Sequence, residues 1–170
     1  ESLTPNKNDK AIKLIEDLNE SGYGQYYKFL LLKCPNCGKA IGPIFSNKIN
    51  RSKGIYIDRE GYSKFKCYGN CEYANSNFPV YVVDEDIYNK PPTMIIATVD
   101  KFAQLPHQSK IRKLFGIDVP EIGNHNPPSL IIQDELHLIS GPLGSMVGHY
   151  EGVIQELMKS TQKVKIVAST

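Results

Sequence analysis

Long apolar runs are missing from this 170-residue sequence, and so is the pattern of a signal peptide. The sequence therefore predicts no membrane span, and we expect a cytoplasmic chain whose thiols stay reduced. Internal repeats and low-complexity tracts are also absent, which excludes a solenoid of repeats. The remaining composition, 41% hydrophobic and 22% charged residues, is that of a globular domain with room for one sizeable core.

A phosphate-binding loop of the form G-x-x-x-x-G-K-[ST] is missing as well. The segment Gly38-Lys39-Ala40 comes nearest, but it has neither the preceding glycine spacing nor the hydroxyl residue. Such a loop holds the β- and γ-phosphates of a nucleotide with backbone amides and a lysine. Because the chain lacks this loop, we expect that it does not hydrolyse ATP by itself.

Cysteine is scarce, but the four cysteines form two closely spaced pairs. Cys34 and Cys37 give C-x2-C, and Cys67 and Cys71 give C-x3-C. Two such pairs offer four thiolates from two tight turns, which is the donor set of a tetrahedral structural zinc site. Disulfides are the alternative, although a cytoplasmic chain keeps its thiols reduced. The pattern predicts a structural zinc site with four cysteine ligands, because no coordination position is left open for a substrate.

Positive charge is concentrated around the cysteine pairs. Residues 1–79 carry 12 Lys and Arg against 8 Asp and Glu, whereas residues 80–170 carry 8 against 10. Basic and aromatic residues alternate near the cysteines, a mixture suited to phosphate contacts and base stacking. The alternative is a solvated basic face around a minimal aromatic core. The basic candidates are Lys48, Arg51, Lys53, Lys64 and Lys66, and the aromatic candidates are Tyr56, Tyr62 and Phe65.

β-type and helical patterns alternate in the second half of the chain. Apolar β-type runs cover residues 93–98, 129–133 and 164–168. Between the last two, apolar residues recur at helical spacing over 146–158, which predicts an amphipathic helix. The order strand, helix, strand predicts a parallel sheet.

Two adjacent carboxylates, Asp134 and Glu135, follow the run at 129–133. In open α/β sheets ligands bind beyond the carboxyl ends of the strands, so this pair would lie where a nucleotide and its metal ion bind. As an isolated pair, Asp and Glu after a strand also serve as ordinary turn or cap residues.

These segments carry a resemblance to superfamily 2 helicases. Asp134-Glu135-Leu136-His137 resembles motif II in its D-E-x-H form, residues 97–102 resemble motif Ib, and Ala168-Ser169-Thr170 resembles the beginning of motif III. The three motifs follow the order of that family. More narrowly, residues 82–88, 97–105 and 131–144 resemble the large helicase subunit of DISARM-type bacterial phage-defence systems.

The resemblance implies roles for the residues of motif II. Asp134 would bind magnesium through water, and Glu135 would act as the base toward the hydrolytic water. His137 would couple the nucleotide site to motif III. Magnesium and ATP would bind only in a complete protein, because we expect the chain to be a piece that begins after motif I and ends inside motif III.

The resemblance also implies contacts outside the nucleotide site. Ser169 and Thr170 would relay between the nucleotide and the nucleic acid, and Thr98 and Lys101 would lie near the nucleic-acid backbone. The implied partners are DNA, the rest of the helicase core and other subunits of the defence system. The alternative function is a zinc-stabilised module that binds nucleic acid or docks a protein without any catalytic activity.

The expected fold class is α/β, with a partial RecA-like parallel sheet and a small zinc-ribbon-like β insertion. We expect three segments, which are an N-terminal helix in residues 1–24, the four-cysteine zinc-binding insertion in residues 25–79 and the partial helicase core in residues 80–170. The N-terminal helix is predicted from apolar residues at helical spacing between Ala11 and Leu18.

Overall fold

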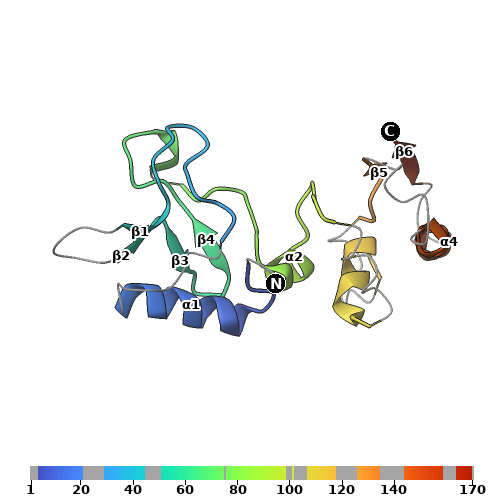
Figure 1. The fold of residues 1–170 in the computed structure, drawn as a ribbon, viewed down its shortest axis with the longest axis horizontal. Coiled ribbons are helices and arrows are strands. Elements are labelled where there is room, and N and C mark those ends of the chain that lie inside the picture. The colour runs from blue at the N-terminus through green and yellow to red at the C-terminus, as the bar shows by residue number, and fades with distance from the viewer. Residues whose placement is uncertain are drawn as a thin grey trace. The chain divides into compact units, whose positions relative to one another are not determined.

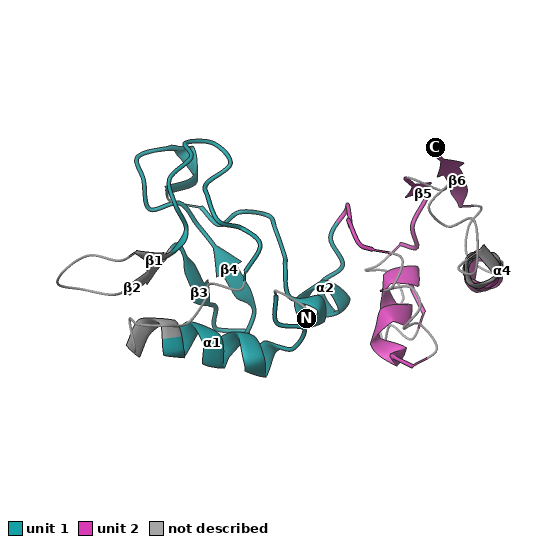
Figure 2. Cartoon of the chain, in the orientation of Figure 1, with its two compact units in different colours: residues 1–92 teal, residues 93–170 magenta. Residues whose placement is uncertain are grey.

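The structure is a computed structural model (Figure 1). It describes residues 4–20, 29–44, 51–74, 76–98, 101, 107–117, 126–134, 144–158 and 164–169. The chain forms two compact units, unit 1 from Glu1 to Pro92 and unit 2 from Thr93 to Thr170 (Figure 2). Among the helices of the described ranges, none has the length and apolar character needed to cross a membrane.

The described residues of unit 1 form two antiparallel strand pairs and two α-helices. β1 pairs with β2, and β3 pairs with β4, each over three residues. Isolated two-stranded sheets of this size are only marginally stable, so they depend on what packs against them. The elements are α1 (Asn8–Glu20), β1 (Gly42–Ile44), β2 (Arg51–Lys53), β3 (Ile55–Ile57), β4 (Ser63–Phe65), the 3₁₀ turn η1 (Glu72–Ala74) and α2 (Asp84–Asn89).

The helix predicted near the N-terminus is confirmed as α1, and it packs against β2, β3 and β4. Its buried face presents Ala11, Leu14 and Ile15 to a core that also contains Phe29 and Phe65. The Phe29 and Phe65 rings meet edge to face with centroids 6.0 Å apart. α1, α2 and the cysteine region therefore fold as one unit, although the sequence placed predicted boundaries at 24/25 and 79/80. Those boundaries stay predictions about domain organisation.

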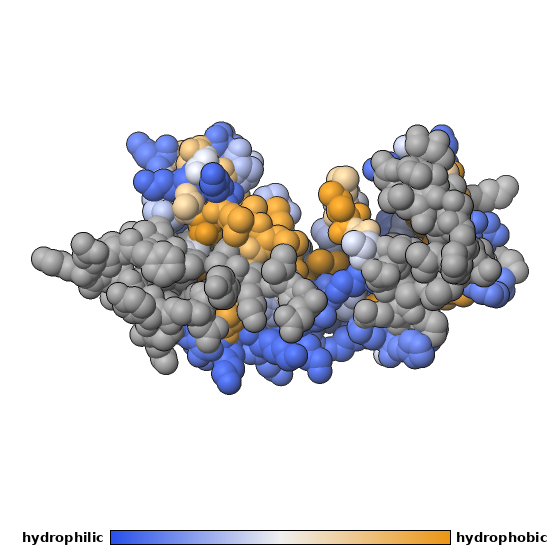
Figure 3. All heavy atoms as spheres, in the orientation of Figure 1, coloured by the Kyte–Doolittle hydropathy of each residue, from blue (hydrophilic) through white to orange (hydrophobic). Residues whose placement is uncertain are grey.

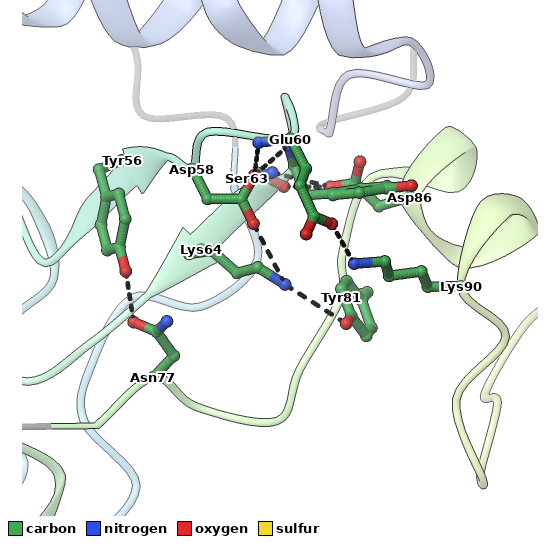
Figure 4. Close-up of polar contacts among 10 residues, drawn as sticks. Tyr56, Asp58, Glu60, Ser63, Lys64, Asn77, Tyr81, Asp86 and Lys90 are labelled. Carbon is green, nitrogen blue, oxygen red and sulfur yellow. Dashed lines mark hydrogen bonds and ion pairs between the residues drawn. The ribbon is translucent and has the colours of Figure 1, made fainter.

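A buried carboxylate ties α2 to the β3–β4 hairpin (Figure 4). The Ser63 hydroxyl and backbone N–H donate to Asp86 Oδ2 at 2.6 and 3.0 Å. Asp86 Oδ1 is buried without a hydrogen-bond partner. Desolvation therefore raises the pKa of Asp86, although Ser63, Asn8 and Lys64 act to lower it. The buried carboxylate therefore destabilises the fold whenever it is ionised.

Two substitutions of Asp86 separate the destabilisation caused by its buried charge from the stabilisation contributed by its hydrogen bonds. Asp86→Ala leaves the buried Ser63 donors unpaired and should lower the free energy of unfolding by about 1–3 kcal/mol. Asp86→Asn keeps an acceptor for Ser63 without the charge, so near pH 7 it should be at least as stable as the wild type. The pKa of Asp86 is raised in the folded state, so the wild type gains stability as the pH falls through that pKa. Urea unfolding of the wild type and of Asp86→Asn near pH 7 and near pH 5 gives the free energy of unfolding of each protein. The difference between the two free energies should be smaller at the acidic pH. A larger difference there would contradict the prediction.

Unit 2 contains a parallel strand pair joined through a helix. β5 and β6 pair in parallel, with Leu130 opposite Lys165 and Gln133 opposite Ala168. The two strands, the helix between them and the parallel pairing confirm the sequence prediction. The RecA-like architecture stays a prediction. The elements are the 3₁₀ helix η2 (Ser109–Phe115), β5 (Leu130–Gln133), α4 (Gly144–Met158) and β6 (Lys165–Ala168).

The strand predicted at residues 93–98 is not formed in the structure. Met94, Ile95 and Ile96 are exposed there instead. β-propensity mainly reflects packing of side chains against neighbouring strands. A segment without a neighbouring strand has no partner for its backbone hydrogen bonds, so the apolar run alone does not make it a strand. The apolar run alone does not specify which strand it would pair with, so it could not predict whether a strand forms.

Candidate functional site

The first cysteine pair lies on a tight turn. The Cys34 N–H donates to Lys39 O at 2.8 Å, and the Gly38 N–H donates to Cys34 O at 2.9 Å. Gly38 has a φ of 70°, a left-handed conformation that glycine adopts without strain. The turn therefore brings both Cys34 and Cys37 to the same side of the segment.

The second pair, Cys67 and Cys71, lies on a loop in which backbone N–H groups donate to Tyr73 O and to Cys67 Sγ. The Cys67 N–H donates to Tyr73 O at 3.2 Å, and the Gly69 N–H donates to Cys67 Sγ at the same distance. A Cβ at Gly69 would lie 3.3 Å from Cys67 Sγ and 3.4 Å from Cys37 Sγ. A side chain at position 69 would therefore press against these two sulfurs, so the loop favours glycine there.

The two turns place all four sulfurs within 4.8 Å of one another. Cys37 Sγ and Cys67 Sγ are 3.5 Å apart, and Cys34 Sγ and Cys71 Sγ are 3.9 Å apart. Sulfurs that each lie about 2.3 Å from one tetrahedral ion are about 3.8 Å from each other. The cluster could therefore bind one metal ion, and the four free thiols are the predicted ligands.

Burial and hydrogen bonds shift the pKa values of the cluster's thiols in different directions. At Cys34, desolvation is outweighed by N–H groups of Cys37 and Asn36, which lower the pKa of the thiol to about 7. Desolvation by burial dominates at Cys67 and raises the pKa of that thiol to about 12. It also raises the pKa of Cys71. Metals bind thiolates, so an ion that binds here must displace the protons of these thiols.

Lys64, a predicted nucleic-acid contact, is held by neighbours within unit 1 (Figure 4). Its ammonium lies 3.7 Å from Asp58 Oδ2 and donates to the Tyr81 hydroxyl at 3.3 Å. It also lies over the ring of Tyr81, 4.5 Å from the centroid, and 5.6 Å from that of Tyr62. Its charge is already balanced by a carboxylate, which argues against a strong phosphate contact at Lys64.

The other candidates near the cysteines differ in their surroundings. Phe65 is fully buried, so its predicted availability for base stacking is wrong. In the three-residue strand β4 the side chains alternate, and Phe65 points into the core with Ser63. Lys66 is exposed, with its ammonium 5.3 Å from the ring centroid of Tyr56. The structure describes only the backbone of Arg51 and Lys53 in β2, and Lys48 lies outside the described residues.

Apolar side chains gather on the surface of unit 1 (Figure 3). Leu30 and Leu32 are exposed in the segment that leads to the first cysteine turn, while Phe29 beside them is buried. One side of this segment therefore belongs to the core and the other faces solvent.

In unit 2, Asp134 and Ser169 lie at the same edge of the parallel pair. Each directly follows its strand, since Gln133 and Ala168 are the last paired residues. The Ser169 N–H donates to Gln133 O at 2.8 Å, which holds the two strand ends together. The described residues thus bring together one member of the motif II candidates and one of the motif III candidates. Glu135, His137 and Thr170 lie outside them.

Thr98 and Lys101 are joined by a backbone hydrogen bond. The Lys101 N–H donates to Thr98 O at 3.0 Å. The two predicted backbone contacts are therefore neighbours in space, and their nucleic-acid role stays a prediction.

One comparison with known proteins gives a clear relationship. The chain is 34% identical over 202 aligned residues to the DISARM protein DrmA of Bacillus paralicheniformis, and the alignment covers 94% of the chain. The chain is homologous to a segment of DrmA. It spans only 18% of the length of that protein. No family model matches the chain, and no solved structure matches it.

Proposed function

We propose that this chain is a segment of an ATP-dependent nucleic-acid helicase or translocase that acts in bacterial phage defence. One observation carries the proposal, which is the position of Asp134 and Ser169 at the carboxyl ends of adjoining parallel strands. Nucleotides bind at that edge of open parallel sheets. The homology with DrmA supports the defence role, and DNA and other subunits of a DISARM-type system are the proposed partners.

The exposed face of the parallel pair agrees with a larger sheet. Leu130 is 48%, Ile132 64% and Val167 40% exposed. Leu130 and Ile132 share a face by their two-residue spacing, and Val167 pairs with Ile132. Parallel strands normally have both faces covered, so this face fits strands that are completed by further elements of a longer protein.

In the proposed site each acidic residue has a separate task. Asp134 would hold the magnesium ion of a bound nucleotide, and Glu135 would take the proton of the attacking water. His137, Ser169 and Thr170 would couple this site to the nucleic acid. The chain has no phosphate-binding loop, so turnover would require the remainder of the core.

A single substitution in the full-length protein tests the proposal. Glu135→Gln removes the proposed base and should lower nucleic-acid-stimulated ATP turnover by about 10²-fold or more. Nucleotide binding should be largely retained, because the proposed metal ligand Asp134 is intact. Glu156→Gln on α4 makes the same chemical change at an exposed position and should leave turnover unchanged. Equal turnover in the Glu135→Gln protein and the wild type would refute the assignment.

For the cysteine cluster we propose zinc as the ion, in a structural role. Four thiolates in a tetrahedral arrangement select zinc or iron, and a closed set of four cysteines has no open position for a substrate. Cys34, Cys37, Cys67 and Cys71 would be the ligands. Metal analysis of purified protein should find one zinc per chain.

A further inference from the structure

Net positive charge within unit 2 is concentrated in one short stretch. Residues 101–117 contain four Lys and Arg and no Asp or Glu, a net charge of +4. The rest of residues 93–170 contains three Lys against seven Asp and Glu, a net charge of −4. Unit 2 is therefore neutral overall but strongly divided, and such a division creates a local positive field.

Three of these four basic residues lie on η2, and this helix is anchored in the unit. η2 buries Ile111 and Phe115, and it ends at Gly116, which has a φ of 70°. The Gly116 N–H donates to Lys113 O at 3.0 Å, and the Ile117 N–H donates to Arg112 O at 3.2 Å. The basic residues are thus fixed on a turn of helix rather than carried on a loose loop.

The three basic side chains of η2 reach solvent. Lys110 and Arg112 are exposed, and Lys113 is half-buried. We define these three residues as the η2 basic surface. In a 3₁₀ helix residues three apart share a side, so Lys110 and Lys113 are neighbours along the helix.

We infer that the η2 basic surface binds the phosphate backbone of a nucleic acid. It would add a contact beyond Thr98 and Lys101 and beyond the lysines near the cysteines. The inference deepens the proposed function by locating a nucleic-acid contact on unit 2, but it does not depend on ATP turnover. Arg and Lys presented from a rigid element suit phosphate oxygens, and they need no base-specific geometry.

An anionic membrane surface is the competing partner for a basic patch. Membrane-binding surfaces combine basic residues with exposed apolar ones that enter the lipid. On η2 the large apolar residues Ile111 and Phe115 are buried, and Leu114 is half-buried. A surface with charge but without exposed large apolar residues favours the nucleic acid.

A double charge reversal in the 170-residue chain tests the inference. Binding of a fluorescein-labelled single-stranded oligothymidine is followed by anisotropy over a series of salt concentrations. K110E/R112E should weaken binding at low salt by about tenfold or more. The slope of log K against log salt should become shallower by about 1.4, which corresponds to two lost phosphate contacts on a single strand. K110Q/R112Q, which adds no new charge, should give a smaller loss in the same direction.

The matched control is K10E/K13E, which reverses two charges on exposed positions of α1 and so makes the same change in net charge. It should change affinity by about twofold or less. Equal losses in K10E/K13E and K110E/R112E would overturn the inference, because net charge alone would then explain binding. Failure of the wild type to bind the oligonucleotide at low salt would also overturn it. Binding to phosphatidylserine vesicles is measured in parallel. A K110E/R112E protein that loses vesicle binding but keeps oligonucleotide binding would overturn the inference too. Unchanged circular dichroism verifies that each variant folds. Because the assay contains no ATP, its outcome stays separate from that of the Glu135→Gln turnover experiment.

Discussion

Chelation of the proposed zinc ion is expected to unfold unit 1 and to leave the β5–β6 pair of unit 2 intact. Cys34 and Cys67 are buried within the same core as Phe29 and Phe65. The strands around them are three residues long, too short to be stable alone. Structural zinc binds Cys-rich peptides with about 10–16 kcal/mol, which is comparable to the whole stability of a small domain. Losing the ion should therefore remove the fold of unit 1.

Amide hydrogen exchange measured before and after chelation tests this expectation. Peptides that cover β3 and β4 should lose protection, while peptides that cover β5 and β6 should keep theirs, because unit 2 contains no cysteine. Cys67→Ser should reproduce the effect without a chelator. Protection of β3 and β4 that survives complete removal of metal would show that the cluster does not hold unit 1 together.

The cysteine cluster could be predicted because its information is local. The spacings C-x2-C and C-x3-C predict two turns that each carry two cysteines. A single tertiary contact between the two turns is then enough to bring the four sulfurs together. The β5–α4–β6 order was predictable for a related reason, since each pattern is strong within its own segment. In both cases sequence-local preference and tertiary packing favour the same structure.

Contacts between distant segments were not predictable from pattern. The Glu85 carboxylate accepts the Asn8 N–H at 2.9 Å across 77 residues, and Ser63 meets Asp86 across 23. Nothing in the spacing of these residues marks them as partners. Phe65 illustrates the same limit, because an aromatic residue beside Lys64 fits both a stacking surface and a core. Only its register in β4 decides for the core.

A second large effect is expected from Gly54→Ala, at the connection between β2 and β3. Gly54 has a φ of 80°, and a Cβ there would lie 2.6 Å from the backbone oxygen of Lys66. The left-handed conformation costs a side-chain-bearing residue about 1–2 kcal/mol, and the steric overlap adds about 1–3 kcal/mol. The free energy of unfolding should therefore fall by about 2–5 kcal/mol. Because Lys66 directly precedes Cys67, any backbone shift that relieves the clash should also weaken metal binding.

Gly61→Ala is the matched control for the clash. Gly61 also has a left-handed φ, 86°, but a Cβ there meets nothing within 4 Å. Gly61→Ala should therefore lower the free energy of unfolding by the conformational cost alone, about 1–2 kcal/mol, and should leave metal affinity unchanged. Urea unfolding of the metal-loaded proteins, followed by circular dichroism, gives both losses, and competition with a chromogenic chelator gives both metal affinities. Equal losses in the two variants would mean that the Lys66 backbone yields freely, and that the β3–β4 hairpin does not rigidly position Cys67.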